Sequence, residues 1–562
     1  MKNFIIKGLA SLLVVGSMAS CSDDYLNTTP TGSISSTMIC ATVDNARKAL
    51  YGACSVMYSV NSATPAQPYW GGESAMGMFY GETIGQDCLD SNLCIQTKGS
   101  WDMFLKMEQI DNSDYIWTQS MWVYAYQIIG QCNEIIAGID AAEGNEYERE
   151  LIKAEALAMR AHAYWRLMQC YAPRWNDSNN GQAECVILRL EPTTADMPVA
   201  TCNEVYDQLY NDLKTAIAGY LLAEENGYKP TFHWEPSKNV CYGIFARIAL
   251  LKNDWATAAE MAGKAREGYT LMSDADYRMG HTVANNEWMW WNSRIAEDSM
   301  VYADWGTAFT ANGYYASNTV NGSLRMNIDL YRQIPETDMR RDFYLTEDKL
   351  GQDVEKMYDA KNVSSDDQKI KQARILKKAK EWMQEITPEG YGIPYLQKSA
   401  ETEPLIAYGA AVKFLSAVGE TGPAAPAYMR AAEMYLTEAE ALAMLGKNAE
   451  AQAIMNQVNQ PRDAEYTCTA TGDELIEEIR LYRRIELWGE GFNWFDLKRW
   501  EKGLVRRIWV EGDATCKVWL EDEDALEAKL KLMKEHDLAG VAAWRLGFEK
   551  SDIWELILKY VN

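Results

Sequence analysis

The stretch at residues 481–500 constrains the fold of this chain most, because it combines charged and aromatic residues at helical spacing. It reads LYRRIELWGEGFNWFDLKRW. Upstream, Thr471 and Glu474 predict a capping box at the start of a helix. The two glycines inside the stretch end that helix. Residues 492–500 then begin a second helix with aromatic side chains on more than one face. The pattern predicts a buried helical hairpin.

Burial of this hairpin requires that its charges have partners. The charged residues concerned are Arg483, Arg484, Glu486 and Asp496. We expect them to pair with one another inside the core. Buried ion pairs can mimic the perturbed groups of an active site, but such pairs are often purely architectural. We therefore interpret the stretch as a structural element.

The N-terminus has the pattern of a lipoprotein signal peptide. Lys2 and Lys7 flank a short apolar run at residues 4–15, and Ala-Ser leads directly into Cys21. The run is too short to span a bilayer as a helix. We predict a signal peptide at residues 1–20 and lipid attachment at Cys21. The alternative is an ordinary secretory signal that precedes a cysteine.

No later segment of the sequence is long and apolar enough to cross a membrane, so we expect the lipid to be the anchor. Each buried CH2 group of the acyl chains would contribute about 0.8 kcal/mol to membrane binding. The formal net charge of −26 argues against nucleic acid and anionic lipid surfaces as partners. It fits a surface protein that handles neutral or cationic ligands.

Helices dominate the predicted organisation. Apolar residues recur at spacings of four and three along residues 121–139 and again along residues 151–168. A turn at residues 143–145 joins these two helices as an antiparallel pair. Residues 249–265 and 439–458 each show a helix, a polar turn and an alanine-rich helix. We predict a mainly α fold, a tetratricopeptide-like helix-pair scaffold with long irregular ligand-binding loops and minor β structure.

Five segments occur together, in an order that one known family shares. They are residues 122–139, 153–175, 332–344, 426–446 and 481–500. In the last segment the matching residues are Arg483, Arg484, Glu486, Leu487, Glu490, Gly491, Trp494, Phe495, Asp496, Leu497, Arg499 and Trp500. These segments resemble the SusD-like (RagB/SusD) family, the outer-membrane nutrient-binding lipoproteins of Bacteroidetes. The acidic residues after Cys21 resemble the signal that sends such lipoproteins to the cell surface.

The resemblance implies a cell-surface glycan-binding lipoprotein that delivers nutrient to a SusC-type TonB-dependent outer-membrane transporter. It implies a lipid-anchored protein that faces the extracellular side. We expect an N-terminal part at residues 21–270 and a C-terminal part at residues 271–562, packed into one globular body. Two alternatives stay open, namely a peptide-binding receptor of the same transporter type and a tetratricopeptide envelope scaffold or enzyme.

Two glycine- and aromatic-rich regions, residues 61–101 and 286–325, lack a periodic apolar face. Loops on a rigid scaffold commonly carry binding sites. Within the second region, Trp288–Trp291 predicts a short strand. The candidate aromatic platform for sugar faces consists of Trp70, Trp101, Trp305, Tyr314 and Tyr315. The candidate hydroxyl partners are Asp87, Asn92 and Asn312. For each aromatic residue, the alternative is burial in the core.

The sequence offers little support for catalysis. Its four histidines, at positions 162, 233, 281 and 536, form no metal-binding spacing. No nucleophile elbow or phosphate-binding loop appears in the right context. We predict a protein that is not an enzyme and has no catalytic residue, metal or cofactor, and we interpret His162 as a packed core residue. A glycosidase carboxylate pair stays open, because it depends on a spatial separation that sequence does not reveal.

Overall fold

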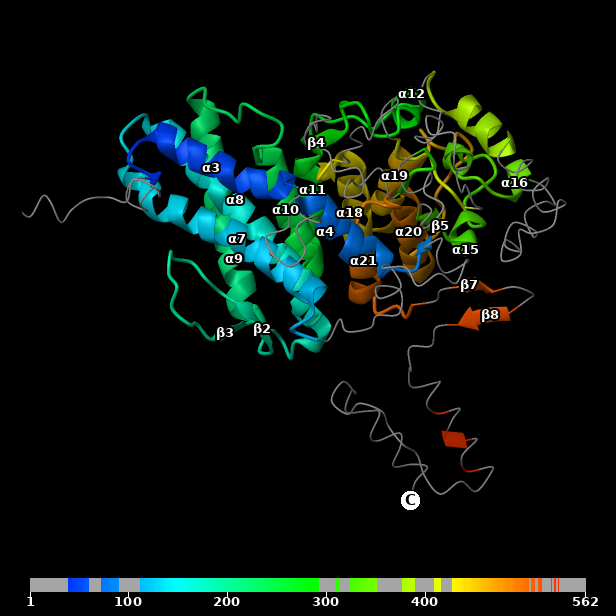
Figure 1. Ribbon diagram of the computed structural model, residues 1–562, viewed down its shortest axis with the longest axis horizontal. Helices are drawn as coiled ribbons and strands as arrows, with labels where there is room; N and C mark the ends of the chain where they lie inside the picture. Colours follow the sequence, from blue (N-terminus) through cyan, green and yellow to red (C-terminus); the bar gives the residue numbers. More distant parts are fainter. Residues whose placement is uncertain are drawn as a thin grey trace, which may run out of the picture. The chain divides into compact units, whose positions relative to one another are not determined.

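The computed structural model describes most of the chain in ten segments (Figure 1). They are residues 39–59, 72–89, 112–292, 309–312, 324–350, 377–389, 409–415, 427–504, 507–510 and 514–517, with isolated residues at 527, 530, 531 and 534. The chain divides into two compact units. The first comprises residues 1–59 and 120–267, and the second comprises residues 60–119 and 268–562. Residues 60–119 thus cluster with the C-terminal half.

The first unit consists mainly of long helices (Figure 1). They are α3 (Val43–Tyr58), α7 (Ile116–Gly138), α8 (Glu146–Tyr171), α9 (Cys202–Glu225), α10 (Lys238–Leu251) and α11 (Trp255–Ala265), with the short 3-10 helices η3 (Ile139–Ala141) and η4 (Trp175–Asp177). One antiparallel hairpin joins β2 (Glu184–Ile187) to β3 (Val199–Thr201). Successive helices pack in pairs, as the sequence predicts for α10 and α11.

Helix α8 is at the centre of the first unit. The predicted apolar stripes of α7 and α8 are both buried, but α8 is also buried on its polar side. Arg160 of α8 donates to both carboxylate oxygens of Asp212 on α9 at 2.8 Å and to Asn133 of α7 at 2.8 Å. Gly219 of α9 lies so close to α8 that an added Cβ would be 3.2 Å from Ala154. Small residues therefore allow the close packing of α8 with α9. His162 is fully buried, as predicted.

The second unit contains α18 (Ala431–Met444), α19 (Asn448–Asn459), α20 (Gly472–Glu486) and α21 (Asn493–Arg499). Its shorter helices are α4 (Gly72–Gly77), the π-helix η2 (Met78–Thr83), α12 (Asp274–Arg278), α15 (Ile328–Tyr331), η6 (Met339–Phe343) and α16 (Glu347–Leu350). Helices α18 and α19 form the predicted pair, and α20 packs on both. The mainly α, tetratricopeptide-like prediction is confirmed.

Short antiparallel pairs supply the β structure described in the second unit. They are β1 (Cys88–Leu89) with β5 (Arg325–Met326), β4 (Trp288–Trp290) with β6 (Met429–Arg430), and β7 (Arg507–Val510) with β8 (Ala514–Lys517). Strand β4 confirms the strand predicted at residues 288–291, and its two tryptophans are buried. Among the residues described, no helix combines the length and the apolar character that membrane crossing requires.

Two local predictions are wrong. Thr471 is the N-cap of α20, but its side chain makes no capping hydrogen bond, so the predicted capping box with Glu474 does not form. Residues 72–83, which we predicted to be irregular, form α4 and η2. The reason is tertiary packing: Gly77 and Gly81 lie against the turn after α20, where a Cβ on Gly81 would be 2.0 Å from the carbonyl oxygen of Gly491.

Candidate functional site

The end of α20 is surrounded by buried ion pairs. The carboxylate of Glu486 accepts from Arg340 and Arg430 at 2.8 Å each. All three side chains are at most 2% exposed. Burial acts to raise the pKa of Glu486, but Arg462, Arg430 and Arg340 together lower it well below its ordinary value. Glu486 is therefore ionised, and both of its carboxylate oxygens accept from arginines. This arrangement is typical of a structural residue.

A buried lysine caps the C-terminal end of the same helix, α20. The ammonium group of Lys413 donates to the carbonyl oxygens of Glu486 and Trp488 at 2.7 Å and to the carboxylate of Glu490 at 2.6 Å. These contacts use all three donors of the ammonium group. Burial acts to raise the pKa of Glu490, but Arg430 and Lys413 lower it to about 2. Lys413 thus satisfies backbone groups that a helix end leaves unpaired.

The pairing predicted within the signature stretch is partly right. Arg483 donates to Asp496 at 2.7 Å, as expected. Arg484 instead donates to Asp87, and Glu486 is bound by arginines outside the stretch. The expectation that the four charges pair with one another is therefore wrong for Arg484 and Glu486. Across the residues described, no group of three or more His, Cys, Asp or Glu side chains could hold a metal ion.

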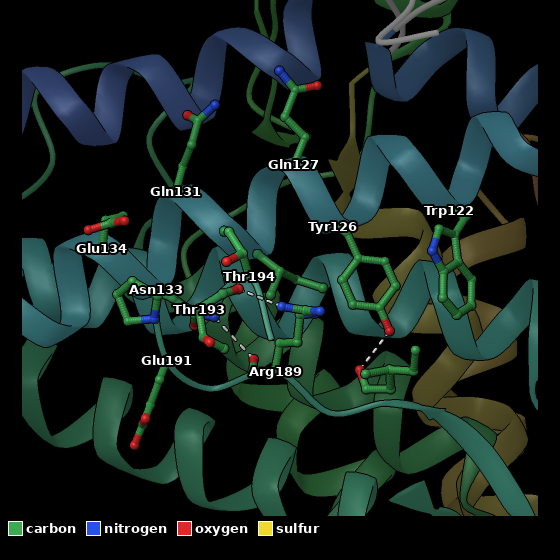
Figure 2. A pocket seen from close by; sticks show the side chains of 14 residues that line it. Trp122, Tyr126, Gln127, Gln131, Asn133, Glu134, Arg189, Glu191, Thr193 and Thr194 are labelled. Carbon is green, nitrogen blue, oxygen red and sulfur yellow. Dashed lines mark hydrogen bonds between the residues drawn. The ribbon is translucent and has the colours of Figure 1, made fainter. Parts of the chain in front are cut away.

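A pocket of about 870 Å³ opens along α7 in the first unit (Figure 2). We call it the α7 pocket. Its lining residues come from α7, from the end of β2 and from the loop that follows; they are Trp122, Tyr126, Gln127, Ile129, Gly130, Gln131, Asn133, Glu134, Ile187, Arg189, Glu191, Pro192, Thr193 and Thr194. Figure 2 shows Trp122 and Tyr126 on the loop side of α7, with Gln127 and Gln131 on its opposite edge. The pocket is therefore aromatic at one end and polar along its length.

Side chains hold the loop wall of the α7 pocket in place. Tyr126 donates its hydroxyl to the carbonyl oxygen of Ile187 at 2.6 Å. The Asn133 amide donates to the carbonyl oxygen of Arg189 at 3.1 Å. The Arg189 guanidinium donates to the carbonyl oxygens of Thr193 at 2.5 Å and Ala195 at 2.8 Å. These bonds preform the wall, which lowers the entropy cost of binding.

The sequence interpretation missed the α7 pocket because it assigned this helix to packing. A signal was nevertheless present. Trp122, Tyr126 and Gly130 follow one another at a spacing of four, off the buried stripe of α7. These two aromatic residues and the glycine lie on a face of the helix that is not buried. Such a face indicates a role other than core packing.

Comparison with known proteins decides the family. The model of the SusD family matches residues 260–537. A second model of the same group, described as starch-binding associating with outer membrane, matches residues 63–250. The chain belongs to the SusD family. Its signature stretch at residues 481–500 lies inside the first match, so the resemblance inferred from that stretch is confirmed.

Solved structures share the SusD fold at low sequence identity. A SusD-like carbohydrate binding protein from Bacteroides vulgatus is 22% identical, with a TM-score of 0.63 over 84% of this chain and 86% of that one. A surface glycan-binding protein from Bacteroides uniformis is 17% identical, with a TM-score of 0.54 over 82% and 88%. A SusD-like protein of Formosa agariphila is 37% identical over 84 residues, which span only 17% of that protein.

Most of the predicted ligand residues of this SusD-family chain lie outside the described residues. They are Trp70, Trp101, Trp305, Tyr314, Tyr315 and Asn92; Cys21, the predicted lipid attachment site, also lies outside them. Asp87 is 1% exposed and bound to Arg484 and Asn493. Asn312 is 3% exposed and accepts from the Thr310 hydroxyl at 2.8 Å. Burial argues against direct ligand contact by Asp87 and Asn312.

Proposed function

We propose that this SusD-family protein captures a glycan at the cell surface and passes it to a SusC-type TonB-dependent transporter. The observation that carries the proposal is the pair of family matches, one of which bears the description starch-binding associating with outer membrane. The formal net charge of −26 suits a neutral ligand.

The proposed anchor is a lipid on Cys21, and the proposed orientation is extracellular. The lysine-flanked apolar run that ends in Ala-Ser-Cys supports this. The principal glycan site that we propose lies in the loops at residues 61–101 and 286–325. Its aromatic platform comprises Trp70, Trp101, Trp305, Tyr314 and Tyr315. Asn92 supplies a hydroxyl partner, while Asp87 and Asn312 support the loops from within.

A direct binding measurement tests the proposal. The full-length protein in mild detergent is titrated with a panel of soluble polysaccharides. A receptor that must release its ligand should bind with a dissociation constant between about 1 mM and 1 μM, or about −4 to −8 kcal/mol. Replacing Trp70, Trp101 or Trp305 by alanine should weaken binding at least about tenfold, or roughly 1.4 kcal/mol.

Co-purification tests the transporter partnership separately. A stable complex should bury well over about 1,000 Å², so affinity purification from membranes of the source organism should recover an outer-membrane barrel with the lipoprotein. Repeated recovery of the lipoprotein alone would contradict the partnership. Binding to peptides, with no binding to any polysaccharide, would contradict the glycan assignment.

A further inference from the structure

We infer that the α7 pocket is a second saccharide site, separate from the loops proposed above, and that it takes a short neutral oligosaccharide. The inference rests on the proposed glycan-binding function. The pocket volume of about 870 Å³ lies within the range of small-molecule sites. It suits a few sugar rings, not a folded domain. Four features of the pocket select this ligand class.

The first feature is a fixed aromatic end. The rings of Trp122 and Tyr126 lie 4.8 Å apart, and both are half-buried, so part of each ring faces the pocket. Tyr171 packs edge-on against Trp122 at 5.3 Å, and the hydroxyl of Tyr126 is held by Ile187. The rings therefore have little freedom to lose on binding. An aromatic ring held in this way suits the flat C–H face of a sugar.

The second feature is a supply of uncharged polar groups. Gln127 and Gln131 line the pocket from the edge of α7 opposite Trp122 and Tyr126 (Figure 2). No hydrogen bond to another described residue engages either amide. Thr193 and Thr194 bring hydroxyl groups from the loop wall. Amides and hydroxyls both donate and accept, as sugar hydroxyls do.

The third feature is the charge of the lining. Arg189 is the only cationic side chain among the lining residues, and its guanidinium is bound to the carbonyl oxygens of Thr193 and Ala195. Glu134 and Glu191 add two carboxylates. An acidic sugar would meet these carboxylates without a free cation to pair with. The lining therefore favours neutral over acidic saccharides.

The fourth feature is Gly130, in the middle of α7. Glycine weakens a helix relative to alanine, yet a Cβ at this position would have nothing within 4 Å, and its φ is not positive. Packing within the described chain therefore does not require glycine here. Gly130 leaves the helix backbone open to close approach from the pocket, which a ligand lying along α7 would use.

A peptide strand fits this pocket less well. Strand addition needs an edge with unpaired backbone groups. The carbonyl oxygens of Ile187, Arg189 and Leu190 in the loop wall already accept from side chains. Those of Thr193 and Ala195 accept from Arg189. Side chains therefore already occupy these carbonyl acceptors, which a peptide strand would need.

The test uses the full-length protein in mild detergent and a panel of neutral trisaccharides of glucose, xylose, mannose and galactose, with a uronic-acid trisaccharide for comparison. Gly130→Gln fills the pocket with a good helix-forming residue. The matched control, Ala137→Gln, adds a similar side chain at an exposed position of α7 outside the pocket. Trp122→Ala removes part of the aromatic end. Calorimetry measures affinity, and thermal melting measures folding.

We expect Gly130→Gln to weaken binding of at least one neutral trisaccharide tenfold or more without lowering Tm, while Ala137→Gln leaves affinity unchanged. Affinities that Gly130→Gln and Trp122→Ala both leave intact would overturn the pocket site but leave the proposed function standing. A parent protein that binds no saccharide at all would overturn both. Preference of the parent protein for the uronic-acid trisaccharide would also overturn the inference.

Discussion

Arg484 of α20 holds Asp87 in a two-point ion pair. Its Nε donates to one carboxylate oxygen at 2.8 Å and its Nη2 donates to the other at 2.6 Å, across 397 positions of sequence. Asn493 donates to the same carboxylate, and the Trp488 indole donates to the backbone carbonyl oxygen of Asp87 at 2.9 Å. This contact ties the start of the second unit to its signature hairpin.

Removing either partner of this pair should destabilise the protein. Arg484→Ala leaves the buried Asp87 carboxylate without its cation, and we expect it to cost about 3–5 kcal/mol in unfolding free energy. Asp87→Ala leaves only the partly buried Arg484 guanidinium unpaired and should cost less. The double variant should cost clearly less than the sum of the two. Denaturant unfolding measures all three. The exposed pair of Lys48 and Asp44 is the control, where substitution should cost under about 1 kcal/mol. Additive costs at Arg484 and Asp87 would contradict the coupling.

Gly81→Ala should be strongly destabilising. The new Cβ would be 2.0 Å from the carbonyl oxygen of Gly491, which is backbone and cannot rotate away. We expect a loss of about 3 kcal/mol or more, at the upper end of overpacking costs. The control is Gly503→Ala, where a Cβ would meet nothing within 4 Å and the change should stay within about 0.5 kcal/mol. Equal melting temperatures for the two variants would contradict the close backbone contact.

Glu82 should make stability depend on pH. Burial raises the pKa of Glu82 from 4.5 to about 8, even though the amides of Gly491 and Phe492 donate to it. Because the pKa of Glu82 is higher in the folded than in the unfolded state, its contribution to the unfolding free energy is most favourable at low pH. This contribution is lost as pH rises from about 4.5 through about 8. Glu82→Gln keeps the acceptor oxygen and removes the titration.

The parent protein should therefore lose stability relative to Glu82→Gln over that pH range, by at most about 1.4 kcal/mol per pH unit. Unfolding free energies measured at pH 4.5, 6 and 8 test this. A difference between the two proteins that stays constant with pH would show that Glu82 does not titrate there.

Cys21→Ala should release the protein from the membrane. Without the thiol no acyl chain can be attached, and a lipid anchor depends on the buried CH2 groups of that chain. Cell fractionation should find the variant in the soluble fraction. The parent protein on intact cells should be accessible to added protease. A variant that stays membrane-bound, or a parent that intact cells protect, would contradict the anchor.

Much of the helical scaffold was predictable from the sequence, because helix formation is read from local periodicity. The stripes of α7 and α8, the pairs α10–α11 and α18–α19, and strand β4 all lie where the pattern predicts them. The end of α20 was also predictable. Gly489 and Gly491 adopt φ values of +78° and +87°, which side-chain-bearing residues rarely take.

By itself, the sequence determined the helix pairs and the helical hairpin, since each depends on residues close together in the chain. It also indicated the family, through five segments that each carry a local pattern. Only the tertiary structure decided which charges pair, because Arg484 finds Asp87 across 397 positions. It also decided that Gly81 is a packing residue and that α7 carries a pocket, whose wall comes from a loop some 60 positions further along. Contacts between residues so far apart in sequence depend on how the folded elements pack against one another. A local sequence pattern does not contain this information.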